Sequence, residues 1–155
     1  MRQAMVQATH EATRASGGRP VPAANLHVTL AFLGSVPERR LGELTEIARG
    51  AAAWGRLELT FDHLEYWGTA RLLCALPAEA LAPIAVLSRR LQDALAASGF
   101  TPDLKPFRPH VTVVRKVSRP SRIEQIHSVV WSFTELALVE SRTLATGPLY
   151  SVVES

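Results

Sequence analysis

The sequence predicts an α+β fold in which the strands pair largely antiparallel. Three observations support this prediction. The predicted elements run helix, strand, helix, strand, strand, helix and then three strands; two apolar runs flank a short glycine-containing segment in a hairpin pattern; and apolar residues recur at helical spacing in two long segments. Since strands and helices do not alternate regularly, α+β is favoured over a doubly wound parallel sheet.

The first part of the chain predicts a helix, a strand and a second helix. Residues 3–16 are rich in Ala, Gln, Glu and Arg and end at a glycine pair, which is typical of a helix with a glycine stop. Leu26 to Leu33 alternates and is closed by Gly34, which predicts a strand. Glu38 to Trp54 carries apolar residues at helical spacing and predicts the second helix.

The rest of the chain begins with the predicted hairpin, Leu57 to Trp67 and Arg71 to Leu76, around Gly68-Thr69-Ala70. Pro77 to Ser98 predicts a long helix whose apolar stripe should cover a sheet. Three prolines exclude regular structure from Thr101 to Pro109 and predict a loop. Three strands are then expected, at His110 to Lys116, Ser132 to Glu140 and Leu149 to Val153.

Composition bounds the class of protein. A chain of 155 residues, 47% hydrophobic and 20% charged, suits one domain with a substantial core or two small duplicated lobes. The net charge of +3 would help to attract a phosphorylated or nucleic-acid ligand but carries little weight alone. The single cysteine, Cys74, excludes an internal disulfide. We find neither a membrane-length apolar stretch nor a secretory signal, so we expect a cytoplasmic protein without a membrane partner.

The tripeptide His-Val-Thr occurs twice, beginning at His27 and at His110. Side chains alternate along a strand, so each His shares a face with the Thr two positions on, Thr29 or Thr112, while the Val points into a core. If the fold joins the two copies, one neutral imidazole can take a proton from an attacking oxygen and the other, protonated, can give one to a leaving oxygen. The hydroxyls could bind phosphate oxygens.

Four residues near the motifs are further candidates. Arg108 or Arg115 could add a fixed positive charge for a phosphate, and Phe32 and Phe107 could stack on a base. Strict alternation would place Arg115 on the face opposite His110, so its approach requires a bulge or an earlier strand end. The three tryptophans are expected to anchor cores.

Alternative explanations exist for the motifs. Either copy alone is ordinary strand composition, because Thr favours strands and a His on a half-exposed strand is usually solvated; the pair, each after a proline-containing approach, favours a site. Zinc is the main rival, but neither motif has a second ligand at the usual spacing, so we expect no metal and no cofactor. His10, His63 and His127 are expected to be structural or solvated.

Residues 22–34 and 107–115 resemble the paired signatures of the 2H phosphoesterase superfamily, and most closely those of its bacterial RNA 2′,3′-cyclic phosphodiesterases, formerly called 2′-5′ RNA ligases. The likeness runs from about residue 3 to the C-terminus. It implies that residues 1–155 form a single bilobed domain, with two pseudo-symmetric antiparallel sheets, outer helices and a central groove carrying both His-x-Thr strands.

The resemblance also implies hydrolysis of a 2′,3′-cyclic phosphate to a 2′-phosphate without metal or ATP. His27 would be the general acid for the 3′ leaving oxygen and His110 the general base for water, while Thr29 and Thr112 would hold the phosphate. Phe32 and Arg115, each five residues after its motif His, match positions used for substrate contact. The expected partner is RNA with a 2′,3′-cyclic phosphate end or a small cyclic-phosphate nucleotide.

Members of the family usually begin with an apolar strand before the first helix, and that strand is missing here. We expect either that the natural chain starts earlier, or that the sheet edge left exposed is covered by another molecule; otherwise a monomer is expected. Two other functions stay open: a non-catalytic module that binds RNA ends or nucleotides in the same groove, and an interaction domain without a ligand. Ligation through a 2′-5′ bond could be a side activity, although water favours hydrolysis.

Overall fold

The computed structural model describes residues 1–52, 55–79, 82–103, 105–120 and 124–153. Helices and antiparallel strands are mixed along the chain, so the predicted α+β class is confirmed. The chain divides into two compact units, each assembled from three stretches of sequence: Met1–Thr29, Glu58–Ala82 and Arg108–Ser132 in the first, and Leu30–Leu57, Pro83–Phe107 and Phe133–Ser155 in the second. That these units are the lobes of one domain over residues 1–155 stays a prediction.

The first unit begins with two short helices where one was predicted, α1 (Arg2–Ala8) and α2 (His10–Ser16). Thr9 separates them, and its buried Oγ1 donates a hydrogen bond to the Met5 carbonyl at 2.8 Å. A hydroxyl bonded back to its own helix competes with the regular backbone and bends it, which accounts for the break. The predicted glycine stop is confirmed, because Gly17 caps α2 with a left-handed φ of 66°.

A five-stranded sheet with the order β1-β4-β3-β2-β5 forms the rest of this unit. Its strands are β1 (Arg19–Pro20), β2 (Leu57–Trp67), β3 (Leu72–Pro77), β4 (Val111–Arg115) and β5 (Glu124–Phe133). The predicted hairpin is confirmed: β2 and β3 pair antiparallel, with Trp67 opposite Leu72. The predicted strand from His110 is also confirmed, one residue shorter at each end.

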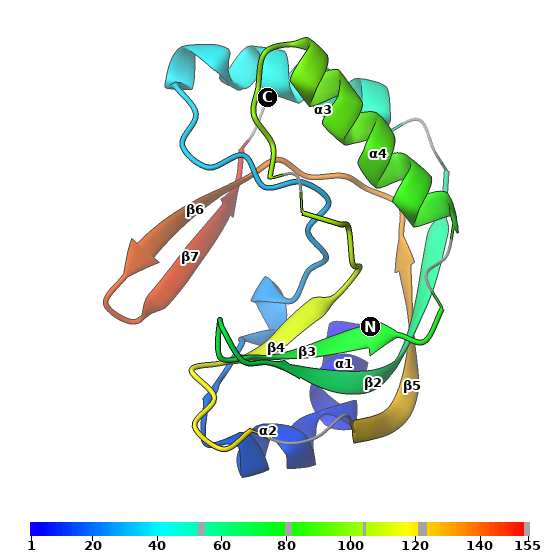
Figure 1. Ribbon diagram of the computed structural model, residues 1–155, viewed down its shortest axis with the longest axis vertical. Helices are drawn as coiled ribbons and strands as arrows, with labels where there is room; N and C mark the ends of the chain where they lie inside the picture. Colours follow the sequence, from blue (N-terminus) through cyan, green and yellow to red (C-terminus); the bar gives the residue numbers. More distant parts are fainter. Residues whose placement is uncertain (53–54, 80–81, 104, 121–123, 154–155) are drawn as a thin grey trace. The chain divides into compact units, whose positions relative to one another are not determined.

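The helices α1 and α2 lie under one face of this sheet (Figure 1). A pocket of about 280 Å³ is lined by residues of both helices and by Val113 of β4, so Val113 points toward the helices. Val111, two positions earlier and fully buried, shares that face. Thr112 therefore points to the opposite face, which we call the site face.

The strand predicted from Leu26 to Leu33 is wrong. Only Val28 makes a β-bridge, to Val111, and a 3₁₀ turn, η1 (Ala23–Asn25), precedes it. The chain passes from the first unit to the second after Thr29, and the Leu30 carbonyl accepts a hydrogen bond from the Ser88 hydroxyl at 3.1 Å. The backbone thus leaves the sheet after one bridge, which an alternating sequence does not reveal.

The second unit packs two helices around an apolar cluster. A 3₁₀ turn, η2 (Glu38–Arg40), leads into α3 (Leu41–Ala51), and α4 (Ala82–Ala97) lies beside α3 (Figure 1). Leu44 of α3 is buried with Leu91 and Leu95 of α4 and with Phe100. Both helices were predicted, although Trp54 and Leu81 lie outside the described residues. The start predicted for α4, Pro77, is wrong, because Pro77 is the last residue of β3.

The strand predicted at Leu149 to Val153 is confirmed, but the other C-terminal strands differ from the prediction. A two-stranded antiparallel sheet joins β6 (Val139–Leu144) and β7 (Gly147–Val152), so the two sheets that the described residues form are unequal in size. The strand predicted over Ser132 to Glu140 is wrong, because β5 ends at Phe133 and β6 starts at Val139. Most of β5 was missed because it is an edge strand whose first half is exposed and polar.

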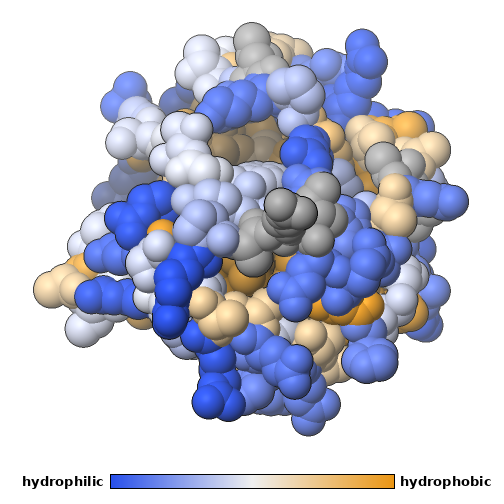
Figure 2. Space-filling view, turned by 60° about the horizontal axis from the view of Figure 1, so that its bottom comes forward, coloured by the Kyte–Doolittle hydropathy of each residue, from blue (hydrophilic) through white to orange (hydrophobic). Residues whose placement is uncertain are grey.

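Within the described residues, no helix combines the length and apolar character needed to cross a membrane. On the face seen in Figure 2, hydrophobic residues form small patches among hydrophilic ones.

Candidate active site

The Val28–Val111 bridge brings the two His-Val-Thr segments together. In antiparallel register, the residues on either side of the bridge face each other, which sets His27 opposite Thr112 and Thr29 opposite His110. Val111 lies on the face that packs against the helices, and Val28, paired opposite it, shares that face. The four polar side chains next to these valines therefore share the site face. All four belong to the first unit. The predicted juxtaposition of the two motifs is therefore present, with one segment on a strand and the other held by a single bridge.

Both imidazoles are oriented in the same way, by the carbonyl two residues before each ring. Nδ1 of His27 donates to the Asn25 carbonyl at 2.6 Å, and Nδ1 of His110 donates to the Arg108 carbonyl at 2.8 Å. Since a carbonyl only accepts, a neutral ring bonded like this keeps its proton on Nδ1 and has an unprotonated Nε2. Nε2 is therefore the atom of each ring that can exchange a proton with a ligand.

His110 is tuned toward its neutral form. Burial lowers its pKa most, the hydrogen bond to the Arg108 carbonyl raises it, and the positive charges of His27 and Arg108 lower it, so the net pKa lies below the ordinary value. The effect of His27 on His110 also shows that the two rings are electrostatic neighbours. A histidine that is neutral near pH 7 is suited to act as a base.

Thr112 contacts Cys74, its partner across β3 and β4, with Sγ and Oγ1 3.8 Å apart. Burial raises the pKa of the Cys74 thiol to about 11, despite the contact with Thr112. The thiol is therefore protonated at neutral pH and is a poor nucleophile. Cys74 is a small buried side chain beneath the site, as expected from the sequence.

A bulge in β4 turns Arg115 toward the site face. Leu73 and Cys74 are adjacent on β3, but their partners on β4 are Val114 and Thr112, so β4 has one extra residue there. Val113 and Val114 are accordingly both buried, and alternation resumes with Arg115 on the same side as Thr112. The charge of Arg115 also acts on the Cys74 thiol. The bulge that the sequence required for this arginine is present.

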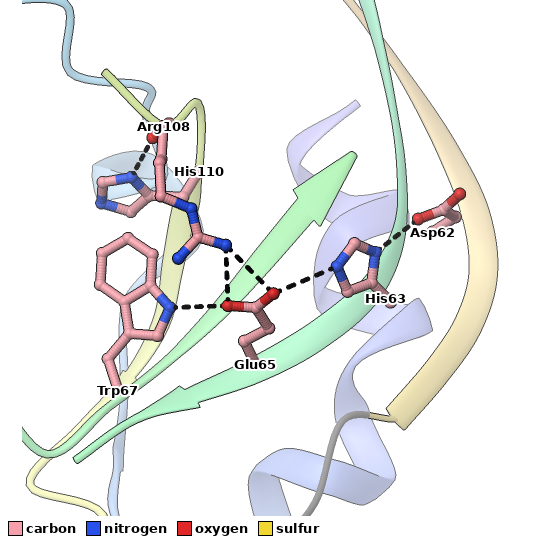
Figure 3. Close-up of polar contacts among 6 residues, drawn as sticks. All are labelled: Asp62, His63, Glu65, Trp67, Arg108 and His110. Atoms are coloured by element: carbon pink, nitrogen blue, oxygen red, sulfur yellow. Dashed lines mark hydrogen bonds and ion pairs between the residues drawn. The ribbon is translucent and has the colours of Figure 1, made fainter. Parts of the chain in front are cut away.

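Two residues that sequence reasoning missed lie beside His110, on β2. The Trp67 ring lies against the imidazole, with the ring centroids 4.4 Å apart. The indole Nε1 donates to Glu65 at 3.2 Å, and the Arg108 guanidinium contacts both oxygens of that carboxylate (Figure 3). Trp67 was expected in a core and is instead half-buried. Alternation along β2, which places Glu65 and Trp67 on one face, was the available signal.

The two predicted stacking residues belong to the second unit. Phe32 is 65% exposed, and its carbonyl accepts a hydrogen bond from the Asp103 amide at 3.1 Å. Phe107 is half-buried. The first unit thus supplies neither phenylalanine, and the base-stacking role of both stays a prediction.

The other histidines agree with the structural or solvated expectation. His10 and His127 are exposed, and His63 is half-buried between two carboxylates. In the part of the chain that the structure describes, no three His, Cys, Asp or Glu side chains cluster in a way that could hold a metal ion.

An α+β fold with two His-x-Thr segments joined by a β-bridge defines a two-histidine protein of the 2H class. The model of the 2′-5′ RNA ligase superfamily matches residues 3–144, and the chain belongs to this superfamily.

Similar proteins agree with this assignment. An RNA 2′,3′-cyclic phosphodiesterase of Thermus thermophilus is 30% identical over 169 residues, covering 99% of this chain and 82% of the relative. A protein of the same name from Escherichia coli is 34% identical over 137 residues, covering 87% of this chain and 76% of the relative. The solved structure of Escherichia coli LigT complexed with 3′-AMP matches with a TM-score of 0.85 at 27% identity, covering 99% of this chain and 90% of that one.

Proposed function

We propose that this protein hydrolyses the 2′,3′-cyclic phosphate of RNA ends or of small nucleotides to a 2′-phosphomonoester. The Val28–Val111 bridge carries the proposal, because it sets both imidazoles and both threonine hydroxyls on one face. The names of the relatives, RNA 2′,3′-cyclic phosphodiesterase, support the reaction. The 3′-AMP bound by a similar structure supports a nucleotide ligand.

The two rings divide the proton transfers. Nε2 of neutral His110 accepts a proton from water as the water oxygen attacks phosphorus. The bond from phosphorus to the 3′ oxygen breaks, and Nε2 of protonated His27 donates a proton to that oxygen. The product keeps its phosphate on the 2′ oxygen. Exchange with solvent then returns His110 to the neutral form and His27 to the protonated one.

The remaining predicted residues would bind the substrate. The hydroxyls of Thr29 and Thr112 would donate to the non-bridging phosphate oxygens, where charge accumulates. Arg115, on the site face, would add a fixed positive charge. Phe32 and Phe107 are proposed to stack on a base. The proposed cellular location is the cytoplasm, and neither a metal nor a cofactor takes part in these steps.

The test is incubation with an RNA that bears a 2′,3′-cyclic end, in EDTA and without ATP, followed by identification of the product isomer. Release of a 2′-phosphate is expected. The variants His27→Ala and His110→Ala should each lose activity by about 10²- to 10⁴-fold, the usual effect of a general acid or base. His127→Ala is the matched control, because His127 is exposed on β5 and lies outside the site.

Full activity in either site variant would remove that histidine from the mechanism. Binding of the cyclic end without any turnover would instead identify the non-catalytic module. A 3′-phosphate product would show that the 2′ oxygen, and not the 3′ oxygen, is the leaving group.

A further inference from the structure

We propose that Glu65 is a positioning residue that fixes the His110 imidazole by holding Trp67 and Arg108 around it. The orientation of the ring follows from the structure alone, whereas its effect on catalysis rests on the proposed function.

His110, Arg108, Glu65 and Trp67 form a closed ring of contacts, which Figure 3 shows. Nδ1 of His110 donates to the Arg108 carbonyl at 2.8 Å, and the guanidinium of the same arginine donates to Glu65 Oε1 and Oε2 at 3.1 and 3.0 Å. Glu65 Oε2 also accepts the indole N–H of Trp67 at 3.2 Å. The Trp67 ring then contacts the imidazole, tilted by 51°. One carboxylate thus connects the group that orients Nδ1 with the ring that packs on the imidazole.

The carboxylate is ionised, as this arrangement requires. Burial alone would raise the pKa of Glu65, but the hydrogen bonds from Trp67 and Arg108 outweigh it and hold the pKa below the ordinary value. An ionised oxygen accepts stronger hydrogen bonds than a neutral one. Trp67 and Arg108 are therefore held by a charged acceptor.

Glu65 also contacts His63, on the side away from His110 (Figure 3). His63, two residues earlier on β2, has Nε2 3.6 Å from Glu65 Oε1 and Nδ1 2.7 Å from Asp62 Oδ1. Alternation puts His63 and Glu65 on the same face of the strand. The carboxylate thus has neighbours on both sides and cannot swing freely.

A purely stabilising ion pair does not explain the arrangement. The Arg108 side chain is 55% exposed, and a pair with one such partner contributes little to stability. The contact matters more for geometry. Glu65 and Arg108 lie 43 positions apart in the sequence, and their ion pair holds in place the Arg108 backbone, whose carbonyl accepts the hydrogen bond from His110. Since Glu65 engages the Arg108 guanidinium, we assign Arg108 to positioning.

The test compares Glu65→Gln and Trp67→Phe with a matched control, Glu58→Gln. Glutamine keeps the size of Glu65 and removes the charge; phenylalanine keeps an aromatic ring and removes the N–H donor. Glu58 is an exposed glutamate on the same strand that accepts a hydrogen bond from the Ser132 hydroxyl. Each variant is assayed for kcat and KM, and its His110 tautomer is read from the ring nitrogen shifts in NMR spectra.

Glu65→Gln should lower kcat by about ten- to a hundredfold, with KM changed less than about twofold, as expected when a reacting group is misplaced. The wild-type His110 should be a single Nδ1–H tautomer, and Glu65→Gln should populate both. Trp67→Phe should change kcat and the His110 tautomer populations in the same direction as Glu65→Gln, but by a smaller amount. Glu58→Gln should match the wild type.

Unchanged kcat and an unchanged tautomer in both site variants would overturn the proposal, as would a rise in KM at constant kcat, which would assign Arg108 to substrate binding. If Glu65→Gln does not fold, Trp67→Phe decides by the same readouts. A wild type without turnover would reject the proposed function alone, because the tautomer still tests the positioning of His110.

Discussion

At the residue scale, burial decides which form His110 takes. The half-buried ring next to His27 and Arg108 has a pKa below the usual value of about 6.5. As pH falls through this pKa, the base becomes protonated and the rate falls, so the acidic limb of kcat/KM should have its midpoint below about pH 6.5. A pH profile of kcat/KM, which reports the free enzyme, measures this midpoint. A midpoint above pH 7 would mean that another group is the base.

The role of the Thr112 hydroxyl can be tested separately from the shape of the threonine side chain. Thr112→Val keeps the branched side chain that suits β4 and removes the hydrogen-bond donor proposed for the phosphate. A hydrogen bond to a charged group contributes about 1.5–3 kcal/mol, so kcat/KM should fall by roughly ten- to a hundredfold. Thr112→Ser, which keeps the hydroxyl, is the control and should retain most activity. Equal activity in Val and Ser variants would assign the hydroxyl to the contact with Cys74 only.

Sequence reasoning could propose the central candidate residues because they form a repeated local pattern. The repeat was enough to propose His27, Thr29, His110 and Thr112 as candidate site residues, and strand alternation was enough to show that Arg115 needs a bulge or an earlier strand end. Glu65 could not, because its role arises from Arg108, 43 positions away, and no local pattern contains that contact. Single residues that act through distant partners need coordinates.

At the element scale, Gly18 allows β1 to approach β4. A Cβ at this position would lie 2.6 Å from the Arg115 carbonyl oxygen and 2.5 Å from a Val114 methyl. Gly18→Ala must therefore displace backbone, and we expect a loss of about 1–3 kcal/mol in the free energy of unfolding, the usual cost of overpacking. Urea denaturation measures it.

The control for this change is Gly42→Ala in α3, where an added Cβ has nothing within 4 Å. Alanine favours helices over glycine by about 1 kcal/mol at most, so stability should stay equal or rise. A Gly18→Ala protein as stable as the wild type would show that β1 can move away from β4 at little cost.

Elements with strong periodicity were predictable, and elements at transitions were not. The β2–β3 hairpin and α4 follow from apolar spacing and a glycine-containing turn. The run after His27 alternates as a strand does, but the chain changes unit after Thr29 and forms one bridge only. A two-residue strand such as β1 is too short for any periodic signal.

At the scale of the whole molecule, 17 basic and 14 acidic residues give a modest net charge of +3. Several cations are engaged within the protein: Arg40, Arg49, Arg108 and Arg142 form ion pairs with glutamates. The net charge is small, so composition alone predicts a small electrostatic contribution to RNA binding.

This balance makes a prediction about substrate length. Each phosphate contact on a single strand contributes about −0.7 to the slope of log affinity against log salt concentration. If the site holds one phosphate, an RNA with a cyclic end and a cyclic mononucleotide should show similar slopes of about −0.7 in log kcat/KM against log salt, measured at constant pH. A chain of two or three nucleotides serves as the intermediate control. A slope of about −3 or steeper for the long RNA alone would reveal several backbone contacts, and would mean that this protein binds RNA over a longer stretch than the site around His27 and His110.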